Sequence, residues 1–212
     1  MKLFRVFFCL LILPVHAHAF IIPDDLLKQV AATHGPDALQ RLTDWQSLSV
    51  ALHGLSQPDQ LETVNRFFNQ IPFLSDLEHW GTEDYWATPV EALSTFGADC
   101  EDYSIGKYLT LRSAGVPEDK LRITYVKALE LNQAHMVVAF YPTPESDPLI
   151  LDNLINDIKP ASQRLDLKPV YSFNGEGLWL TKLQRQDERH IGTPERLDRW
   201  VELNRRLIEG LK

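Results

Sequence analysis

The sequence predicts an α+β domain in which one helix, with a cysteine near its start, packs on an antiparallel sheet. Two observations lead to this prediction. Residues 37–115 carry apolar side chains at helical spacing, whereas residues 121–181 form short runs rich in β-branched and aromatic side chains. Helical and strand segments therefore form separate blocks, and this order is typical of an α+β architecture.

The first 19 residues are typical of an export signal. Two basic residues precede an apolar run over residues 6–15, and Ala17-His18-Ala19 matches the small-residue cleavage pattern. We therefore expect residues 1–19 to be a signal peptide and residues 20–212 to form a single domain. The run is short for a membrane span, although an uncleaved anchor is the alternative.

The charge of the chain narrows the classes of binding partner. The chain has 29 acidic residues against 21 basic ones, and two of the basic residues, Lys2 and Arg5, lie in the predicted signal. We do not expect so acidic a protein to bind nucleic acid or an anionic membrane surface.

The cysteine content bears on disulfides. Of the two cysteines, Cys9 would leave with the signal. Cys100 would then be the only thiol, which excludes an internal disulfide.

The helices are predicted from apolar stripes and caps. Stripes over residues 37–55 and 58–68 predict two helices that pack into the core. Thr88-Pro89-Val90-Glu91 is a helix start, with an N-cap threonine, proline at the first position and glutamate at the third. We expect this helix to end near Gly97.

A further helix is expected to begin immediately. Asp99 is its predicted N-cap and Asp102 the acid at its third position. Cys100 then lies in the first turn, where the helix dipole favours a thiolate. The helix is expected to end at Gly115-Val116-Pro117.

The remaining segments predict an antiparallel sheet and a final helix. The strands are expected from their β-branched and aromatic residues, over residues 121–128, 135–141, 148–154, 169–173 and 177–181. The closing helix is expected over residues 193–212, where apolar residues recur at helical spacing.

A hairpin between two of these strands is expected to bring a histidine to a carboxylate. If the loop is residues 142–145, Tyr141 pairs with Ser146 and His135 falls opposite Asp152. A register shift of two residues would leave both side chains on the same face. An imidazole beside a carboxylate is the base-and-orienter pair of a catalytic triad, and Cys100 would supply its nucleophile.

Each of these residues also has a structural interpretation. A single cysteine is often a small core residue, a histidine at a strand start is often structural, and Asp152 could simply end a strand. Their combination favours catalysis, because the one thiol lies at a helix N-terminus and the histidine and aspartate lie on neighbouring strands.

The acids beside the thiol predict a bound cation. Glu101 and Asp102 are also expected helix-capping residues. Together with Asp99, however, they would raise the pKa of the Cys100 thiol unless a hard cation offset their charge. Carboxylate oxygens suit Ca²⁺ better than Zn²⁺. We therefore predict a Ca²⁺ site formed by Asp99, Glu101 and Asp102.

At these residues the chain resembles the bacterial transglutaminase-like cysteine proteinases, and within them the LapG-type periplasmic proteases. The resemblance spans roughly residues 64 to 181, and its strings are YWATP (residues 85–89), DCEDY (99–103), LRITYVKA (121–128), QAHMV (133–137), LDNL (151–154) and YSFN (171–174).

The resemblance implies a fold, a site and a metal. It implies a papain/transglutaminase-like fold with Cys100, His135 and Asp152 as the triad, and Ca²⁺ dependence through the flanking acids, of which Asp99 and Glu101 match best. Candidate donors to the oxyanion are Trp86 and the backbone N–H of Cys100.

It also implies a substrate and a partner. The substrate is the N-terminal region of a very large cell-surface adhesin, cut at or near a di-alanine, and its release disperses a biofilm. The protease is held inactive by the periplasmic domain of an inner-membrane cyclic di-GMP receptor. The expected location is therefore the periplasm.

Two other functions fit the same residues. In a transglutaminase or amidase an amine rather than water would resolve the thioester. In a non-catalytic, Ca²⁺-dependent binding module the site would be degenerate, although the intact Cys–His–Asp set argues against that interpretation.

Overall fold

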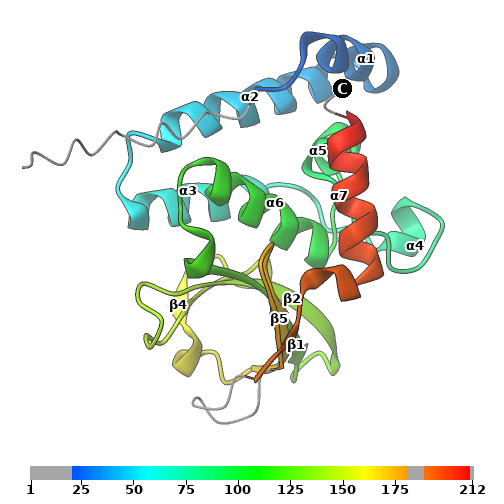
Figure 1. The fold of residues 1–212 in the computed structure, drawn as a ribbon. Coiled ribbons are helices and arrows are strands. Elements are labelled where there is room, and N and C mark those ends of the chain that lie inside the picture. The colour runs from blue at the N-terminus through cyan, green and yellow to red at the C-terminus, as the bar shows by residue number, and fades with distance from the viewer. Residues whose placement is uncertain (1–20, 181–188, 211–212) are drawn as a thin grey trace, which may run out of the picture.

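A computed structural model describes residues 21–180 and 189–210, and the predicted signal at residues 1–19 lies outside them. Figure 1 shows helices stacked above one sheet. The helices are α1 (Asp24–His34), α2 (Pro36–Leu52), α3 (Gln57–Phe68), α4 (Asp76–His79), α5 (Pro89–Thr95), α6 (Cys100–Ser113) and α7 (Asp198–Gly210). Short 3-10 turns are η1 (Glu118–Lys120), η2 (Ala161–Gln163) and η3 (Pro194–Arg196).

The sheet is antiparallel throughout. Its strands are β1 (Leu121–Ala128), β2 (Gln133–Phe140), β3 (Leu149–Leu151), β4 (Lys159–Pro160), β5 (Leu167–Phe173), β6 (Leu178–Leu180) and β7 (Arg189–Gly192). They pair in the order β4-β3-β2-β1-β5-β6-β7. The two longest strands, β1 and β2, lie near the middle and contact α6. The predicted α+β architecture, with the cysteine-bearing helix on an antiparallel sheet, is confirmed.

Several boundaries differ from the prediction. The strand expected over residues 148–154 is limited to β3, because the Asp152 carboxylate accepts the Leu154 N–H (3.0 Å) and turns the chain away from the sheet. The helix expected from residue 193 begins only at Asp198, since residues 194–196 form η3 instead. The short strands β4 and β7 were not predicted.

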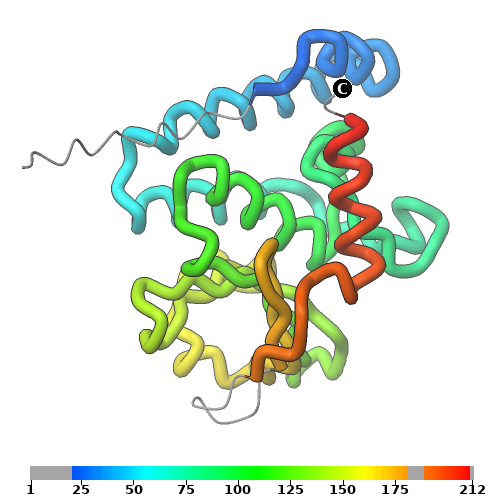
Figure 2. The backbone as a smooth tube through the Cα atoms, in the orientation of Figure 1, coloured from blue at the N-terminus to red at the C-terminus, as the bar shows by residue number. Residues whose placement is uncertain are grey.

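Helix α6 lies at the centre of the fold. The chain trace in Figure 2 places it between the N-terminal helices and the sheet. It contacts α3 on one side and β1 and β2 on the other, and Ile105, Tyr108 and Leu111 are buried in the core. Because α6 begins at Cys100, this packing also fixes the thiol relative to the sheet. No helix among residues 21–180 and 189–210 is long and apolar enough to span a bilayer.

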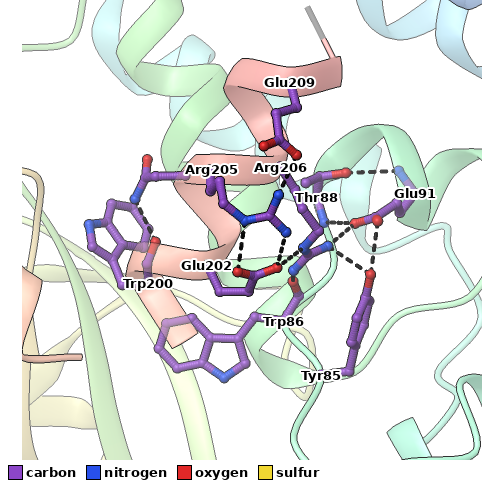
Figure 3. A network of polar contacts seen from close by, with 10 residues as sticks. Tyr85, Trp86, Thr88, Glu91, Trp200, Glu202, Arg205, Arg206 and Glu209 are labelled. Carbon is purple, nitrogen blue, oxygen red and sulfur yellow. Dashed lines mark hydrogen bonds and ion pairs between the residues drawn. The ribbon is translucent and has the colours of Figure 1, made fainter. Parts of the chain in front are cut away.

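Helix α7 is joined to the first half of the chain by Arg206. Figure 3 shows this guanidinium donating to the Trp86 carbonyl (2.5 Å) and the Tyr85 hydroxyl (2.8 Å) and pairing with Glu91. Glu91 also accepts the Thr88 N–H (2.7 Å) in the predicted capping box of α5. One side chain thus connects α7 to the segment that leads into α5.

A glycine allows α6 and α3 to approach closely. A Cβ built on Gly106 would lie 2.3 Å from the ring of Phe68, which is itself buried in the core. We expect Gly106→Ala to destabilise the protein by about 1–3 kcal/mol through overpacking, despite the better helix propensity of alanine. Gly210→Ala is the control, because nothing lies within 4 Å of its added Cβ. Chemical denaturation measures both, and equal stabilities would contradict the close packing.

The Arg206 contacts are expected to matter more than those of its neighbour. Arg206→Met leaves the partly buried Trp86 carbonyl without this donor and Glu91 without its cation, and should lower the free energy of unfolding by about 1–3 kcal/mol. Arg205 has an exposed side chain and pairs with Glu202 and Glu209 on its own helix. Arg205→Met should change the free energy of unfolding much less, because exposed ion pairs contribute little. Thermal or chemical unfolding of the two variants compares them directly.

Candidate active site

The start of α6 positions Cys100 as predicted. Asp102, at the third helical position, accepts the Asp99 N–H (3.3 Å) and the Ala87 N–H (2.6 Å). This carboxylate therefore joins the helix start to the segment before α5. The side chain of Cys100 is partly buried and its thiol donates to Oε2 of Glu101 (2.9 Å).

The local environment keeps this thiol protonated. Burial raises the pKa of Cys100 well above its ordinary value, the nearby charges of Glu101 and Asp99 raise it further, and a hydrogen bond from the Met136 N–H opposes them. Positive charge near the thiol, in addition to the helix dipole, would favour a reactive thiolate.

The expected contact between the histidine and the aspartate is present. His135 on β2 is buried, and its Nε2 lies 2.7 Å from Oδ1 of Asp152.

The predicted register of the hairpin is wrong by two residues: Phe140 pairs with Leu149 and Val138 with Leu151. The hairpin loop is longer than four residues because residues 143–146 form a turn of their own, in which the Ser146 N–H donates to the Thr143 carbonyl (3.0 Å). The shift of two preserves the shared face.

Asp152 is ionised. Burial opposes its charge, but hydrogen bonds from His135, the Leu154 N–H and Arg164 outweigh burial and lower the pKa of Asp152 to about 2. An ionised carboxylate can only accept a hydrogen bond. Nε2 of His135 is therefore the nitrogen that carries a proton, and Nδ1 is the nitrogen left to act as a base.

Cys100 and His135 line the same cleft, which has a volume of about 1260 Å³. Trp86 also lines it, with its indole N–H donating to Oδ1 of Asp84 (2.9 Å). Trp86 is thus at the cleft, as an oxyanion donor would be, but its N–H is engaged by Asp84. The exposed side chains of Phe73 and Leu77 lie on the wall of the same cleft.

The acids near Cys100 form two overlapping groups. Oxygens of Asp76, Asp99 and Asp102 lie within 4.8 Å of one another, and the same holds for ligand atoms of Asp99, Cys100 and Glu101. Asp99 belongs to both groups. The three predicted metal ligands therefore do not form one cluster, and the all-carboxylate cluster contains Asp76, which the sequence analysis missed. In the structure Asp76 lies within a helix capping box formed by Ser75 and Glu78, and no local sequence signal connects it to the other two acids.

Two buried oxygens in this cluster have no hydrogen-bond donor among the residues that the structure describes. They are Oδ1 of Asp76 and Oδ1 of Asp99. Burial raises the pKa of Asp76 to about 6, with Glu101 and Asp84 adding to the rise against the Tyr85 N–H. Burial and then repulsion from Glu101, Asp102 and Asp76 raise the pKa of Asp99. Unsatisfied carboxylate oxygens held together at such cost fit a hard divalent cation.

Two buried cations behind Asp152 were also missed. Arg164 donates to Oδ2 of Asp152 (2.6 Å) from the loop before β5. Lys107 lies on α6 two turns after Cys100 and is buried, and burial lowers its pKa to about 7 although the charge of Asp152 opposes this. No periodicity or short motif marks either residue, so only the folded structure reveals them.

Comparisons with known proteins identify the family of this chain. Residues 46–167 match the family described as bacterial transglutaminase-like cysteine proteinase. A search of curated proteins found no match.

Solved structures of LapG from Legionella pneumophila are similar over most of both chains. The EGTA-treated form is 47% identical, covers 90% of this chain and 100% of its own, and has a TM-score of 0.77. The calcium-bound form is 47% identical, covers 86% and 98%, and has a TM-score of 0.74. With the family match spanning more than half of its length, the chain belongs to the bacterial transglutaminase-like cysteine proteinases.

Proposed function

We propose that this protein is a Ca²⁺-dependent periplasmic cysteine endopeptidase with Cys100, His135 and Asp152 as its catalytic residues. The observation that carries the proposal is the placement of Cys100 and His135 in one cleft with Asp152 bonded to the far nitrogen of the ring (2.7 Å). This is the nucleophile, base and orienter arrangement of thiol-dependent acyl transfer.

In the proposed mechanism Nδ1 of His135 takes the proton from the Cys100 thiol. The thiolate then attacks the carbonyl carbon of the scissile peptide bond, and backbone donors at the start of α6 stabilise the oxyanion. The imidazolium gives its proton to the leaving amine as the C–N bond breaks. Water, deprotonated by His135, then hydrolyses the thioester. Asp152 stays ionised throughout and holds the ring in one orientation.

Asp76, Asp99 and Asp102 would hold the cation, with Glu101 beside them. Their two unsatisfied buried oxygens are the feature of this chain that supports the site. A Ca²⁺ there would supply positive charge near the thiol and so favour its ionisation. The calcium-bound and EGTA-treated LapG structures support the choice of metal.

The resemblance to LapG-type proteases supports the remaining parts of the proposal. The substrate would be the N-terminal region of a large surface adhesin, cut near a di-alanine, and its release would disperse a biofilm. The predicted signal at residues 1–19 supports a periplasmic location. There the protein would be sequestered by the periplasmic domain of an inner-membrane cyclic di-GMP receptor.

One prediction of the proposed function concerns the nucleophile and the base. Cys100→Ala and His135→Ala should each reduce cleavage of an N-terminal adhesin fragment from the same genome by at least about 1000-fold. His53→Ala is the matched control, because His53 is exposed on the helical layer, and it should cleave normally. Gel analysis with mass spectrometry of the products provides the measurement. Cleavage by Cys100→Ala would overturn the proposal, and a crosslinked product would indicate an amine acceptor instead of water.

The second prediction concerns the metal. A chelator should abolish cleavage, and Asp76→Asn should raise the Ca²⁺ concentration needed for half-maximal activity by about tenfold or more, because a ligand loses its charge. Asp157→Asn makes the same change at an exposed aspartate and should have no effect. Calcium titration by calorimetry checks binding separately from activity. If Asp76→Asn bound Ca²⁺ with the affinity of the original protein, Asp76 would not be a ligand of the site.

A further inference from the structure

The carboxylate of Asp152 is held on the side away from His135 as well as on the side facing it. Oδ1 contacts Nε2 of His135 (2.7 Å), and Oδ2 accepts from Nη2 of Arg164 (2.6 Å). Only 3% of Arg164 is exposed, and the arginine is not among the residues that line the cleft. It therefore contacts Asp152 from outside the cleft.

Arg164 is itself firmly anchored. Its Nε donates to Oδ1 of Asp166 (3.0 Å) and its Nη2 to Oδ2 of the same residue (2.8 Å), which is a two-bond fork. The Arg164 N–H bonds the Ala161 carbonyl (3.0 Å) in η2, and the Asp166 carbonyl accepts the Leu129 N–H at the end of β1 (2.8 Å). The guanidinium is thus fixed to the sheet before it contacts Asp152.

The backbone at Asp152 is fixed from another direction. Nδ2 of Asn69, next to the end of α3, donates to the Asp152 carbonyl (2.8 Å). The Leu154 N–H bonds Oδ1 of Asp152 (3.0 Å). Because Asp152 lies just beyond the end of β3, no strand pairing holds it. Side-chain contacts replace the ladder, and Arg164 is the one that restrains Oδ2.

We propose that Arg164 is a positioning residue for the catalytic histidine. By fixing Oδ2 of Asp152 it keeps Oδ1 directed at Nε2 of His135, so that the ring holds its proton on Nε2 and presents Nδ1 to the thiol. This inference rests on the proposed function, because it takes His135 as the base and Asp152 as its orienter. Asp166 supports it by holding the guanidinium in place.

A purely structural ion pair would have different consequences. Loss of a buried partner would then lower stability without changing the turnover of the molecules that remain folded. A positioning role requires turnover to fall while substrate binding is preserved, because a small misplacement of a catalytic group slows the chemical step. The tautomer of the His135 ring provides a second signature of a positioning role, and it can be measured without any substrate.

The test compares four variants at a temperature where each is folded by circular dichroism. Arg164→Met removes the donor, Arg164→Lys keeps the charge but loses the fork, and Asp166→Asn weakens the anchor. Arg66→Met is the control, because Arg66 is an exposed arginine paired with Glu62 on α3. The measurements are kcat and KM for the adhesin fragment, and the ¹⁵N shifts of the His135 ring.

We expect Arg164→Met to lower kcat by about 100-fold with KM within about twofold of the original protein. The kcat of Arg164→Lys should lie between those of Arg164→Met and the original protein. Asp166→Asn should lower kcat less than Arg164→Met does, and Arg66→Met should change neither kcat nor KM. The His135 ring should be the Nε2–H tautomer in the original protein and a mixture of tautomers in Arg164→Met.

The inference is overturned if folded Arg164→Met keeps the original kcat and tautomer. If Arg164→Met does not fold, original kcat and tautomer in both Arg164→Lys and Asp166→Asn overturn it equally. Failure of the proposed function looks different, since the unmodified protein would then cut no fragment. The ring tautomer would still report whether Arg164 orients His135.

Discussion

The geometry of the site depends on how the first turn of α6 is held. The Asp102 carboxylate accepts the N–H of Asp99 and the N–H of Ala87 (2.6 Å), so one buried side chain both caps the helix and connects it to the segment before α5. That segment continues into the capping box of α5, whose Glu91 pairs with Arg206 of α7 (Figure 3). Cys100, the proposed nucleophile, therefore lies where the first half of the chain, the last helix and the sheet converge.

This arrangement has an electrostatic cost. Capping with aspartates is favourable at an exposed helix N-terminus, but here Asp102 and Glu101 are buried and Asp76 is buried beside them. Burial and mutual repulsion raise the pKa values of Asp76, Asp99 and Asp102. A cation held by these carboxylates would stabilise the local fold and the thiolate by the same interaction, which couples folding of the loop to reactivity.

Sequence reasoning succeeded where local chemistry determines the outcome. The Thr88 and Asp99 helix starts follow from capping rules, and the shared face of His135 and Asp152 follows from strand parity even though the register was wrong by two. It failed where distant segments meet. Asp76 reaches the site from a short helix, and in the sequence alone it is part of a capping box. Arg164 reaches the site from a loop, and in the sequence alone it could be a surface charge.

The two halves of the site differ in how their carboxylates are compensated. Around Cys100 the neighbouring charges are carboxylates, whereas behind His135 the charge of Asp152 is opposed by Arg164 and Lys107. Hydrogen bonds from Arg164 and the Leu154 N–H help to keep Asp152 ionised, so its contact with His135 needs no added cation. On the thiol side, burial and the charges of Glu101 and Asp99 raise the pKa of Cys100. A cation at the acidic cluster would offset these carboxylates, so the charges of the chain itself support the proposed dependence on Ca²⁺.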